Sequence, residues 1–210
     1  MDIEYFGANC FKLATKKATL VFDDNLAELG LKSITKSGDI ALFSAQHSEP
    51  AMAVKLVIDH PGEYEVSGVS IQGTAARAHM DESNQATATM FKAIVDDIRV
   101  ASVGHIYPEL GDEQLEALGT VDVLFIPVGG NGYTLDGVGA LRVIKKIEPK
   151  MVIPTHYGDS KVKYPVPQQS LDDAIKALAM EPRERITKLK LKTADLALIE
   201  GTQLVILERQ

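Results

Sequence analysis

The chain has 210 residues, 45% hydrophobic and 24% charged, a balance typical of a globular protein with an apolar core. Its net charge of −7 argues against broad binding to a nucleic-acid backbone, which needs a basic surface. The sequence contains no apolar run of about 18 residues, so it predicts no membrane-spanning helix. The N-terminus lacks the basic region of a signal peptide, so we expect a cytoplasmic protein. The single cysteine, Cys10, excludes an intrachain disulfide and a thiolate-rich zinc site.

The first half of the chain has the pattern of short strands. Alternating or continuous apolar runs, bounded by turn residues, predict these strands. We expect one long strand after the Pro61-Gly62 turn, and a hairpin turn at Asp96-Asp97. The predicted strands span residues 2–6, 10–14, 18–23, 39–44, 55–58, 63–73, 88–95 and 97–103.

The second half alternates between helical spacing and buried apolar runs. Helices are predicted over 112–118, 136–147 and about 170–179, and strands over 121–127, 151–154, 186–191 and 203–208. Strands dominate the first half of the chain and strand–helix units the second half. This order predicts a two-sheet α/β sandwich with helices packed outside. No repeat or flexible linker interrupts residues 1–210, so we expect one domain.

Polar stretches follow the predicted strands, at the places where α/β folds hold ligands. They contain most of the histidines, and imidazole is a common ligand of zinc and of other borderline metals. A lone loop histidine is usually a surface residue, and no tight His-x-x-x-His spacing is present. Convergence of several histidines on one metal is therefore a hypothesis. The five histidines are His47, His60, His79, His105 and His156.

Several segments resemble one known family. Gly7-Ala-Asn-Cys-Phe is similar to the Gly-His-Ser-Cys-Phe opening of small metallo-β-lactamase-fold hydrolases near the ascorbate-6-phosphate lactonase branch. Val121-Asp-Val-Leu-Phe-Ile-Pro-Val-Gly-Gly and Glu148-Pro-Lys-Met-Val-Ile-Pro-Thr-His-Tyr match in order, and the resemblance covers nearly the whole chain. It implies a four-layer αββα sandwich, with two mixed sheets flanked by helices, and a metal-dependent hydrolase.

The resemblance also shows a damaged metal motif. Where the family has Thr-His-x-His-x-Asp-His, this chain reads Ser44-Ala-Gln-His-Ser-Glu-Pro50, so only His47 keeps its family identity. Alanine has no donor and proline has neither a side-chain donor nor an N–H. The family's metal-bridging aspartate is replaced by His105, while His79 and His156 match retained ligands. A two-metal site is therefore not expected.

The resemblance leaves a mononuclear site as the prediction. We expect His47, His79, His105 and His156 to enclose one ion, zinc or alternatively iron or manganese, or none. Glu49 would act as a base or a fifth ligand, and Asp23 matches an acid that orients a ligand. Three histidines with an open position would activate a bound water, whereas four would make the ion structural.

Two functions remain open at this point, and a third is disfavoured. The first is a hydrolase of a small ester, lactone or phosphoester, with no nucleic-acid or membrane partner. The alternative is a catalytically inactive family member that serves as a binding or scaffold protein. Nucleic-acid processing is disfavoured by the acidic balance. The glycines around Asn131 (Gly129, Gly130 and Gly132) fit no nucleotide fingerprint, so we expect them to serve the backbone conformation.

Overall fold

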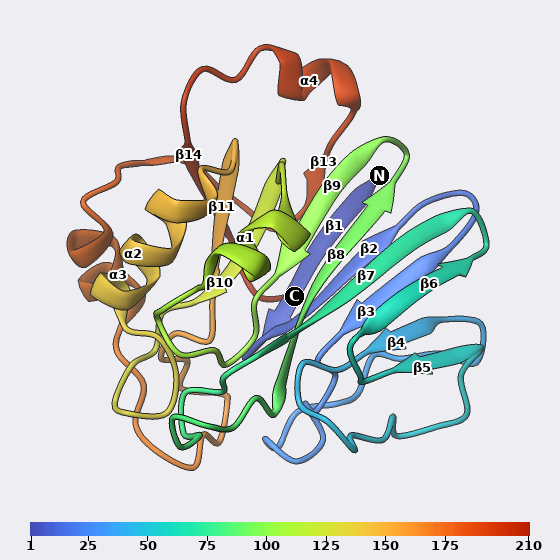
Figure 1. Cartoon of the computed structure of the whole chain (residues 1–210), viewed down its shortest axis with the longest axis horizontal. Helices are drawn as coiled ribbons and strands as arrows, with labels where there is room; N and C mark the ends of the chain where they lie inside the picture. The colour runs from blue at the N-terminus through green and yellow to red at the C-terminus, as the bar shows by residue number, and fades with distance from the viewer.

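The structure, a computed structural model that describes residues 1–210, contains two mixed β-sheets packed face to face (Figure 1). The first is a six-stranded sheet, antiparallel on one side and parallel where β3, β4 and β5 meet. In spatial order its strands are β13 (Leu189–Lys190), β1 (Asp2–Gly7), β2 (Cys10–Ala14), β3 (Thr19–Phe22), β4 (Ile40–Leu42) and β5 (Leu56–Ile58).

The second sheet has eight strands, and its centre is parallel from β9 through β10 to β11. The carboxyl ends of these three strands therefore lie at one edge of the sheet, where the loops that follow them meet. In spatial order the strands are β12 (Pro182–Ile186), β14 (Gln203–Leu207), β11 (Met151–Thr155), β10 (Val123–Pro127), β9 (Ile98–Ser102), β8 (Ala88–Val95), β7 (Val69–Ala76) and β6 (Gly62–Val66).

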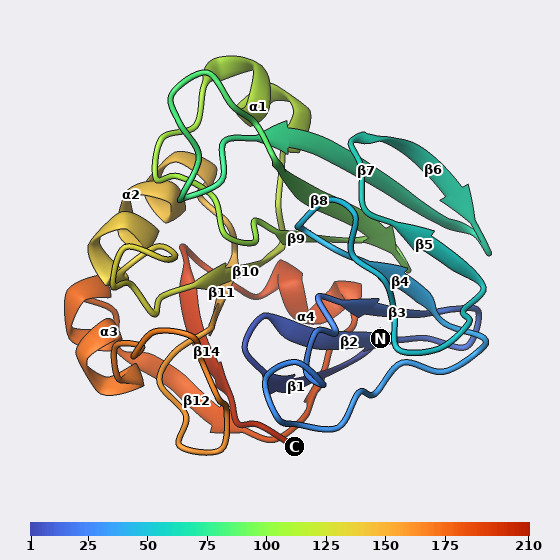
Figure 2. The same cartoon turned by 90° about the horizontal axis from the view of Figure 1, so that it is seen from below.

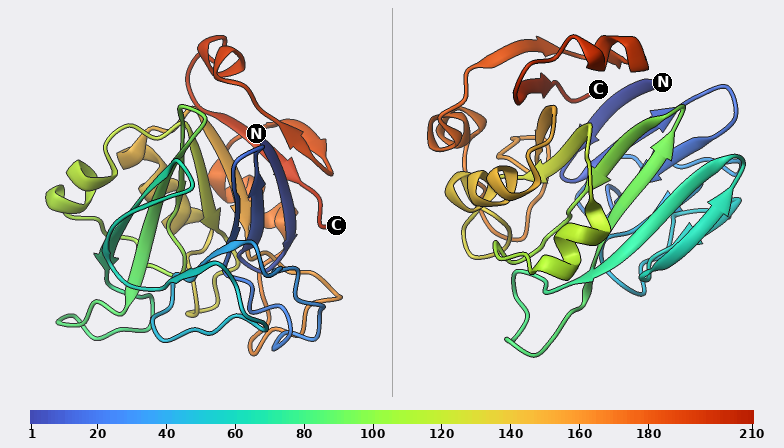
Figure 3. Two further views of the ribbon diagram at one scale, coloured as in Figure 1. Left: turned by 90° about the vertical axis from the view of Figure 1, so that its right-hand side faces the viewer. Right: turned by 45° about the horizontal axis from the view of Figure 1, so that its top comes forward.

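Three helices lie on the outer side of the eight-stranded sheet (Figure 2): α1 (Asp112–Leu118), α2 (Gly137–Ile147) and α3 (Leu171–Leu178). α2 begins at Asp136, whose side chain accepts a hydrogen bond from the Gly139 N–H, and α3 begins at Ser170 in the same way. A short α4 (Thr193–Ala197) links the two sheets near the N-terminus (Figure 3). Two mixed sheets flanked by helices confirm the predicted fold class. No helix has the length and apolar character that crossing a lipid bilayer requires.

One core cluster of 48 buried residues fills the space between the sheets and continues under helices α1, α2 and α3. At its centre the Phe11 ring stacks on Phe22 of its own sheet and on Phe125 of the opposite sheet, with centroid distances of 4.3 Å and 3.6 Å. Replacing such a ring by alanine costs about 3–5 kcal/mol, from lost burial and from the cavity left behind. These aromatic contacts therefore hold the two sheets in register.

Segment 24–36 covers the outer face of the six-stranded sheet. The Asp24 carboxylate anchors it, because one of its oxygens accepts hydrogen bonds from the Ser33 hydroxyl and from the backbone N–H of Ile34 and Thr35. Beneath it Cys10, Val21 and Leu26 form a small second apolar cluster. Cys10 is fully buried there, as predicted for a small hydrophobic residue.

Two predicted strands are wrong in extent. The run 63–73 is not one strand, because Ser67 and Gly68 both have positive φ angles (55° and 70°) and turn the chain into the β6–β7 hairpin. The run 186–191 is divided between β12 and β13, which belong to different sheets. The hairpin predicted at Asp96-Asp97 is confirmed, with φ angles of 50° and 61° at the two turn residues.

Candidate functional site

Two of the histidines that were predicted as metal ligands meet at the carboxyl edge of the parallel strands. His105 follows β9 and His156 follows β11, and their imidazole rings pack edge to face with a centroid distance of 4.5 Å. Burial lowers the pKa of His156 to about 4. Burial also lowers the pKa of His105 well below its usual range, and the imidazoles of His156 and His79 lower it further. Both rings are therefore neutral at pH 7, which is the form that binds a metal.

A cavity of about 50 Å³ lies beside these two rings. Two polar atoms of its lining are buried without a hydrogen-bond partner, the Nδ1 of His105 and the Nδ2 of Asn9. Buried polar groups are normally paired, so unpaired ones mark a place for a bound group. Loops after strands of both sheets line the cavity, contributing Asn9, Asp23, Asn25, Phe43, Ser44, Ala45, Ser48, His105 and His156.

Asp23 is buried in this lining and holds the loop that follows β4. One carboxylate oxygen accepts the Ser44 N–H at 2.6 Å, and the other accepts the Ser44 hydroxyl at 2.9 Å. Burial raises the pKa of Asp23 to about 6, although the hydrogen bonds from Ser44 act in the opposite direction. Asp23 therefore lines the cavity and can exchange a proton near neutral pH.

Gln168 orients the His156 ring, and sequence analysis missed it. The Nδ1 of His156 lies 3.1 Å from the Gln168 Oε1, while the Gln168 amide group donates through Nε2 to the Val166 carbonyl at 2.9 Å. Because an amide oxygen only accepts, Nδ1 of His156 carries the proton and Nε2 keeps its lone pair. No spacing signal links residue 168 to residue 156; only the fold brings them together.

His79 lies at the edge of the site and is half-buried. Its backbone N–H donates to the His105 carbonyl at 2.7 Å, and its imidazole lies close enough to lower the pKa of His105. A second cavity, of about 340 Å³, begins at His79 and Tyr107 and extends to Asn131 and Arg142. His79 thus lies between the His105–His156 pair and the larger polar cavity.

His47 and Glu49 lie on an exposed loop, apart from the pair formed by His105 and His156. His47 has a φ of 60°, and its N–H donates to Asp59 at 2.9 Å. Its ring packs against His60 at 5.2 Å, where His60 is itself paired with Asp59. The structure therefore brings His105 and His156 together, places His79 at the edge of their site, and leaves His47 with His60.

The residues present fit one metal ion better than two. No group of three or more His, Cys, Asp or Glu side chains is arranged to hold a metal ion in this structure. The donor chemistry nevertheless suits a borderline divalent cation, since two neutral imidazoles are in place and the Nδ1 of His105 has no partner. The positions of Ala45 and Pro50 offer no side-chain donor for a second ion.

The glycines around Asn131 serve the backbone, as predicted, and one of them also makes room for the site. A Cβ atom on Gly129 would lie 2.2 Å from the His156 carbonyl oxygen and 2.1 Å from the Gln168 Oε1. Gly130 and Gly132 have positive φ angles of 69° and 71°. Gly129 is therefore required for the close approach of the His156 loop.

Comparison with known proteins agrees with the fold. The sequence model of the beta-lactamase superfamily domain matches residues 2–156. A UPF0173 metal-dependent hydrolase of Thermoplasma acidophilum is 27% identical over 107 residues, which are 48% of this chain and 45% of that protein. The match thus spans less than half the length of that relative.

Solved structures share the same architecture over nearly the whole chain. A Thermotoga maritima protein assigned as a Zn-dependent hydrolase of the metallo-β-lactamase superfamily superposes with a TM-score of 0.78 and 27% identity, covering 99% of each chain. Igni18, a metallo hydrolase of Ignicoccus hospitalis, has the same fold, with a TM-score of 0.62, 16% identity, and coverage of 99% of this chain and 94% of that one.

This chain belongs to the metallo-β-lactamase superfamily. The alternative of a catalytically inactive scaffold is not favoured, because the Thermoplasma and Thermotoga relatives are named as hydrolases.

Proposed function

We propose that this protein is a metal-dependent hydrolase that holds a single divalent ion at His105 and His156, with His79, whose imidazole lies near enough to lower the pKa of His105, as a further candidate ligand. The observation that carries the proposal is the buried pair of neutral imidazoles, with an unpartnered His105 Nδ1 beside a polar cavity. Zinc is the first candidate, because imidazole and zinc are well matched, and iron or manganese are the alternatives. A bound ion would supply an activated water at neutral pH.

The residues of the chain have separable tasks in this proposal. Gln168 holds His156 in the tautomer that leaves Nε2 free, and Asp23, with a pKa of about 6, holds or releases a proton at the cavity wall. Glu49 is exposed in the structure and forms no ion pair, so its predicted role as a base or fifth ligand stays a prediction, as does ligation by His47.

The substrate is proposed to be a small ester, lactone or phosphoester. The hollow of about 340 Å³ next to His79 has the volume of a small-molecule site. Its lining is mostly polar, and the side chains of Asn131 and Arg142 can donate hydrogen bonds to oxygen atoms of a substrate. A long apolar substrate would find little matching surface there.

Metal binding by the purified protein tests the proposal most directly. We expect about one equivalent of ion per chain by elemental analysis, and at least tenfold weaker zinc affinity in His105→Ala and in His156→Ala. His60→Ala is the matched control, because His60 is an exposed histidine outside the group, and it should bind as the wild type does. Less than about a tenth of an equivalent, with no affinity for added zinc, iron or manganese, would overturn the single-ion site.

Hydrolysis is tested separately from binding. We expect the metal-loaded protein to cleave at least one of p-nitrophenyl acetate, γ-butyrolactone and bis(p-nitrophenyl) phosphate, and chelation followed by metal return to remove and restore the activity. A protein that binds one ion tightly and cleaves none of the three classes would leave the ion site standing and contradict the proposed substrates.

A further inference from the structure

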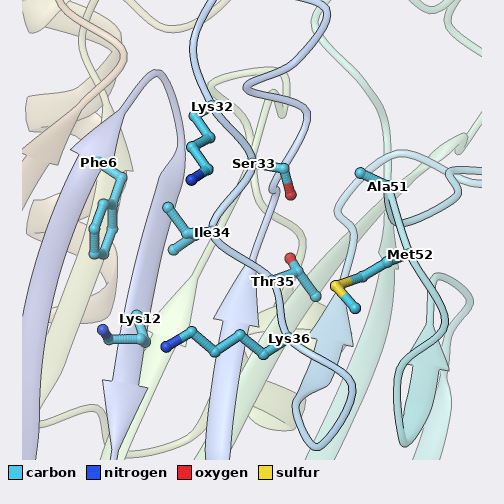
Figure 4. Close-up of a pocket in the computed structure, with 9 residues that line it drawn as sticks. All are labelled: Phe6, Lys12, Lys32, Ser33, Ile34, Thr35, Lys36, Ala51 and Met52. Carbon is cyan, nitrogen blue, oxygen red and sulfur yellow. The ribbon is translucent and has the colours of Figure 1, made fainter.

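A second large hollow lies away from the candidate active site, on the outer face of the six-stranded sheet (Figure 4). Its volume is about 530 Å³, within the range of small-molecule sites. Strands β1 and β2 form its floor, segment 24–36 crosses it, and the loop after β4 closes the far side. The lining consists of Phe6, Lys12, Lys32, Ser33, Ile34, Thr35, Lys36, Ala51 and Met52.

The floor and far wall of this hollow are apolar and partly exposed. Phe6 and Ile34 are only half-buried, and Met52 exposes 47% of its surface. The Lys12 ammonium group lies over the Phe6 ring, 5.1 Å from its centroid, so a cation already borders this apolar surface. Apolar surface in a concave site of this size is available to bind the apolar part of a ligand.

Three lysines stand around the same hollow, although the chain as a whole carries a net charge of −7. Figure 4 shows the ammonium group of Lys32 above Ile34 and those of Lys12 and Lys36 below it. Only Lys12 has a carboxylate partner, Glu4 at 2.9 Å. Lys32 and Lys36 form no ion pair, so positive charge is left for a ligand to neutralise.

The same positive charge borders a smaller adjoining hollow of about 120 Å³, which shares Lys12, Ile34 and Lys36. One acid, Asp39, lies in that lining. It is buried, and its carboxylate accepts the backbone N–H of Lys36 at 2.8 Å. Asp39 therefore holds the backbone of the segment and forms no ion pair with a lysine ammonium group.

The wall of the hollow is held in place before any ligand arrives. The Asp24 carboxylate fixes Ser33, Ile34 and Thr35 by hydrogen bonds of 2.7–2.9 Å. A preformed wall lowers the conformational entropy that a ligand must remove on binding.

We propose that this hollow is a second binding site, for a small amphipathic anion with a carboxylate or phosphate head and a short apolar body. The head would lie among Lys12, Lys32 and Lys36, and the body would pack on Phe6, Ile34 and Met52. The site is independent of the proposed hydrolase activity, because it shares no residue with the cavity at His105 and His156. Its ligand would contact Met52, which lies on the loop that also carries His47 and Glu49.

The test uses decanoate and decyl phosphate, at concentrations below micelle formation, on the full chain with methyl-labelled methionine and isoleucine. We expect both probes to shift the NMR signals of Ile34 and Met52 and to leave Met80, which is 71% exposed and lies outside the hollow, unchanged. Decanol, decyltrimethylammonium and inorganic phosphate should each bind at least about tenfold more weakly, and added salt should weaken decanoate binding. Equal binding of decanol, or no shift at Ile34 and Met52, would overturn the proposal.

Charge reversal separates the lysines of the site from the net charge of the protein. Lys32→Glu with Lys36→Glu should weaken decanoate binding by at least about tenfold. The matched control, Lys16→Glu with Lys17→Glu, changes the net charge equally at exposed positions outside the lining. All four side chains are exposed, so both variants should unfold at the wild-type temperature. Equal weakening in both pairs would contradict the site, as would attachment to phosphatidylglycerol vesicles without binding of the free probes.

Discussion

The imidazole of His105 packs edge to face against the imidazole of His156, although the two residues follow different strands. The strand between them, β10, is parallel to both β9 and β11, so the three carboxyl ends lie at one edge of the sheet. Burial keeps both rings neutral, and this combination of position and protonation state makes them the centre of the candidate site.

Acidification should destabilise the metal-free protein through these two rings. The pKa of His156 falls from 6.5 to about 4 on folding, so the unfolded chain binds a proton at a pH where the folded chain does not. The contribution of neutral His156 to the free energy of unfolding is therefore fully present above pH 6.5. It is lost as the pH falls toward 4, and the loss amounts to about 3 kcal/mol. Urea unfolding in EDTA measures the loss, which should be smaller in His156→Gln. Titration of both imidazoles by NMR near pH 6.5 would contradict the prediction.

Asp23 should have the opposite pH dependence. Its folded pKa of about 6 lies above the usual aspartate pKa of 3.8, so its contribution to stability is present below pH 3.8 and is lost as the pH rises through 6. Asp23→Asn removes the charge and retains the shape, and asparagine tolerates the φ of 44° at this position. The variant should be more stable than the wild type by up to about 3 kcal/mol at pH 8, and nearly equal to it at pH 4. A less stable variant at pH 8 would show that the carboxylate is not strained by burial.

Gln168→Leu should weaken metal binding and leave the fold intact. Without the Oε1 acceptor, the Nδ1 proton of His156 has no partner and the imidazole can change tautomer. We expect a loss of metal affinity of about tenfold or more, together with a changed ¹⁵N tautomer signature of His156. Gln203→Leu is the control, because Gln203 lies on β14 and pairs with Arg183. A fully retained tautomer and affinity would refute the positioning role.

Gly129→Ala should disturb the site through the backbone. The new Cβ would lie 2.2 Å from the His156 carbonyl oxygen, so the His156 loop would have to move. Such overpacking costs about 1–3 kcal/mol, and the displaced imidazole should bind metal more weakly. In Gly132→Ala the new Cβ meets open space, so only the cost of its positive φ, about 1 kcal/mol, is expected. Thermal unfolding compares the two variants, and an equal loss in both would exclude the steric explanation.

Local patterns predicted most of the elements but not every break between them. The α1 boundaries at Asp112 and Leu118 agree with the predicted range, because helical spacing and the acidic first turn are local signals. The turn at Ser67-Gly68 was missed, because only the glycine marks it and the apolar alternation continues across it. The pattern over residues 186–191 predicts one strand, because nothing in the local sequence marks the point at which the chain changes sheets.

The sequence by itself determined the fold class, through its resemblance to a known family and a matching order of strands and helices. It also determined which histidines follow strands, because apolar periodicity marks where each strand ends. Only the tertiary structure decided which histidines meet. His105 and His156 meet, with His79 at the edge of their site, because their loops share one region of the eight-stranded sheet. The backbone at His47, with its φ of 60°, instead places that ring beside His60. The tertiary structure also decided the pairing of Gln168 with His156 and the grouping of the three lysines on the outer face. Both depend on distances between segments that are far apart in the chain. Strand order and loop conformation set these distances, and local residue preferences do not.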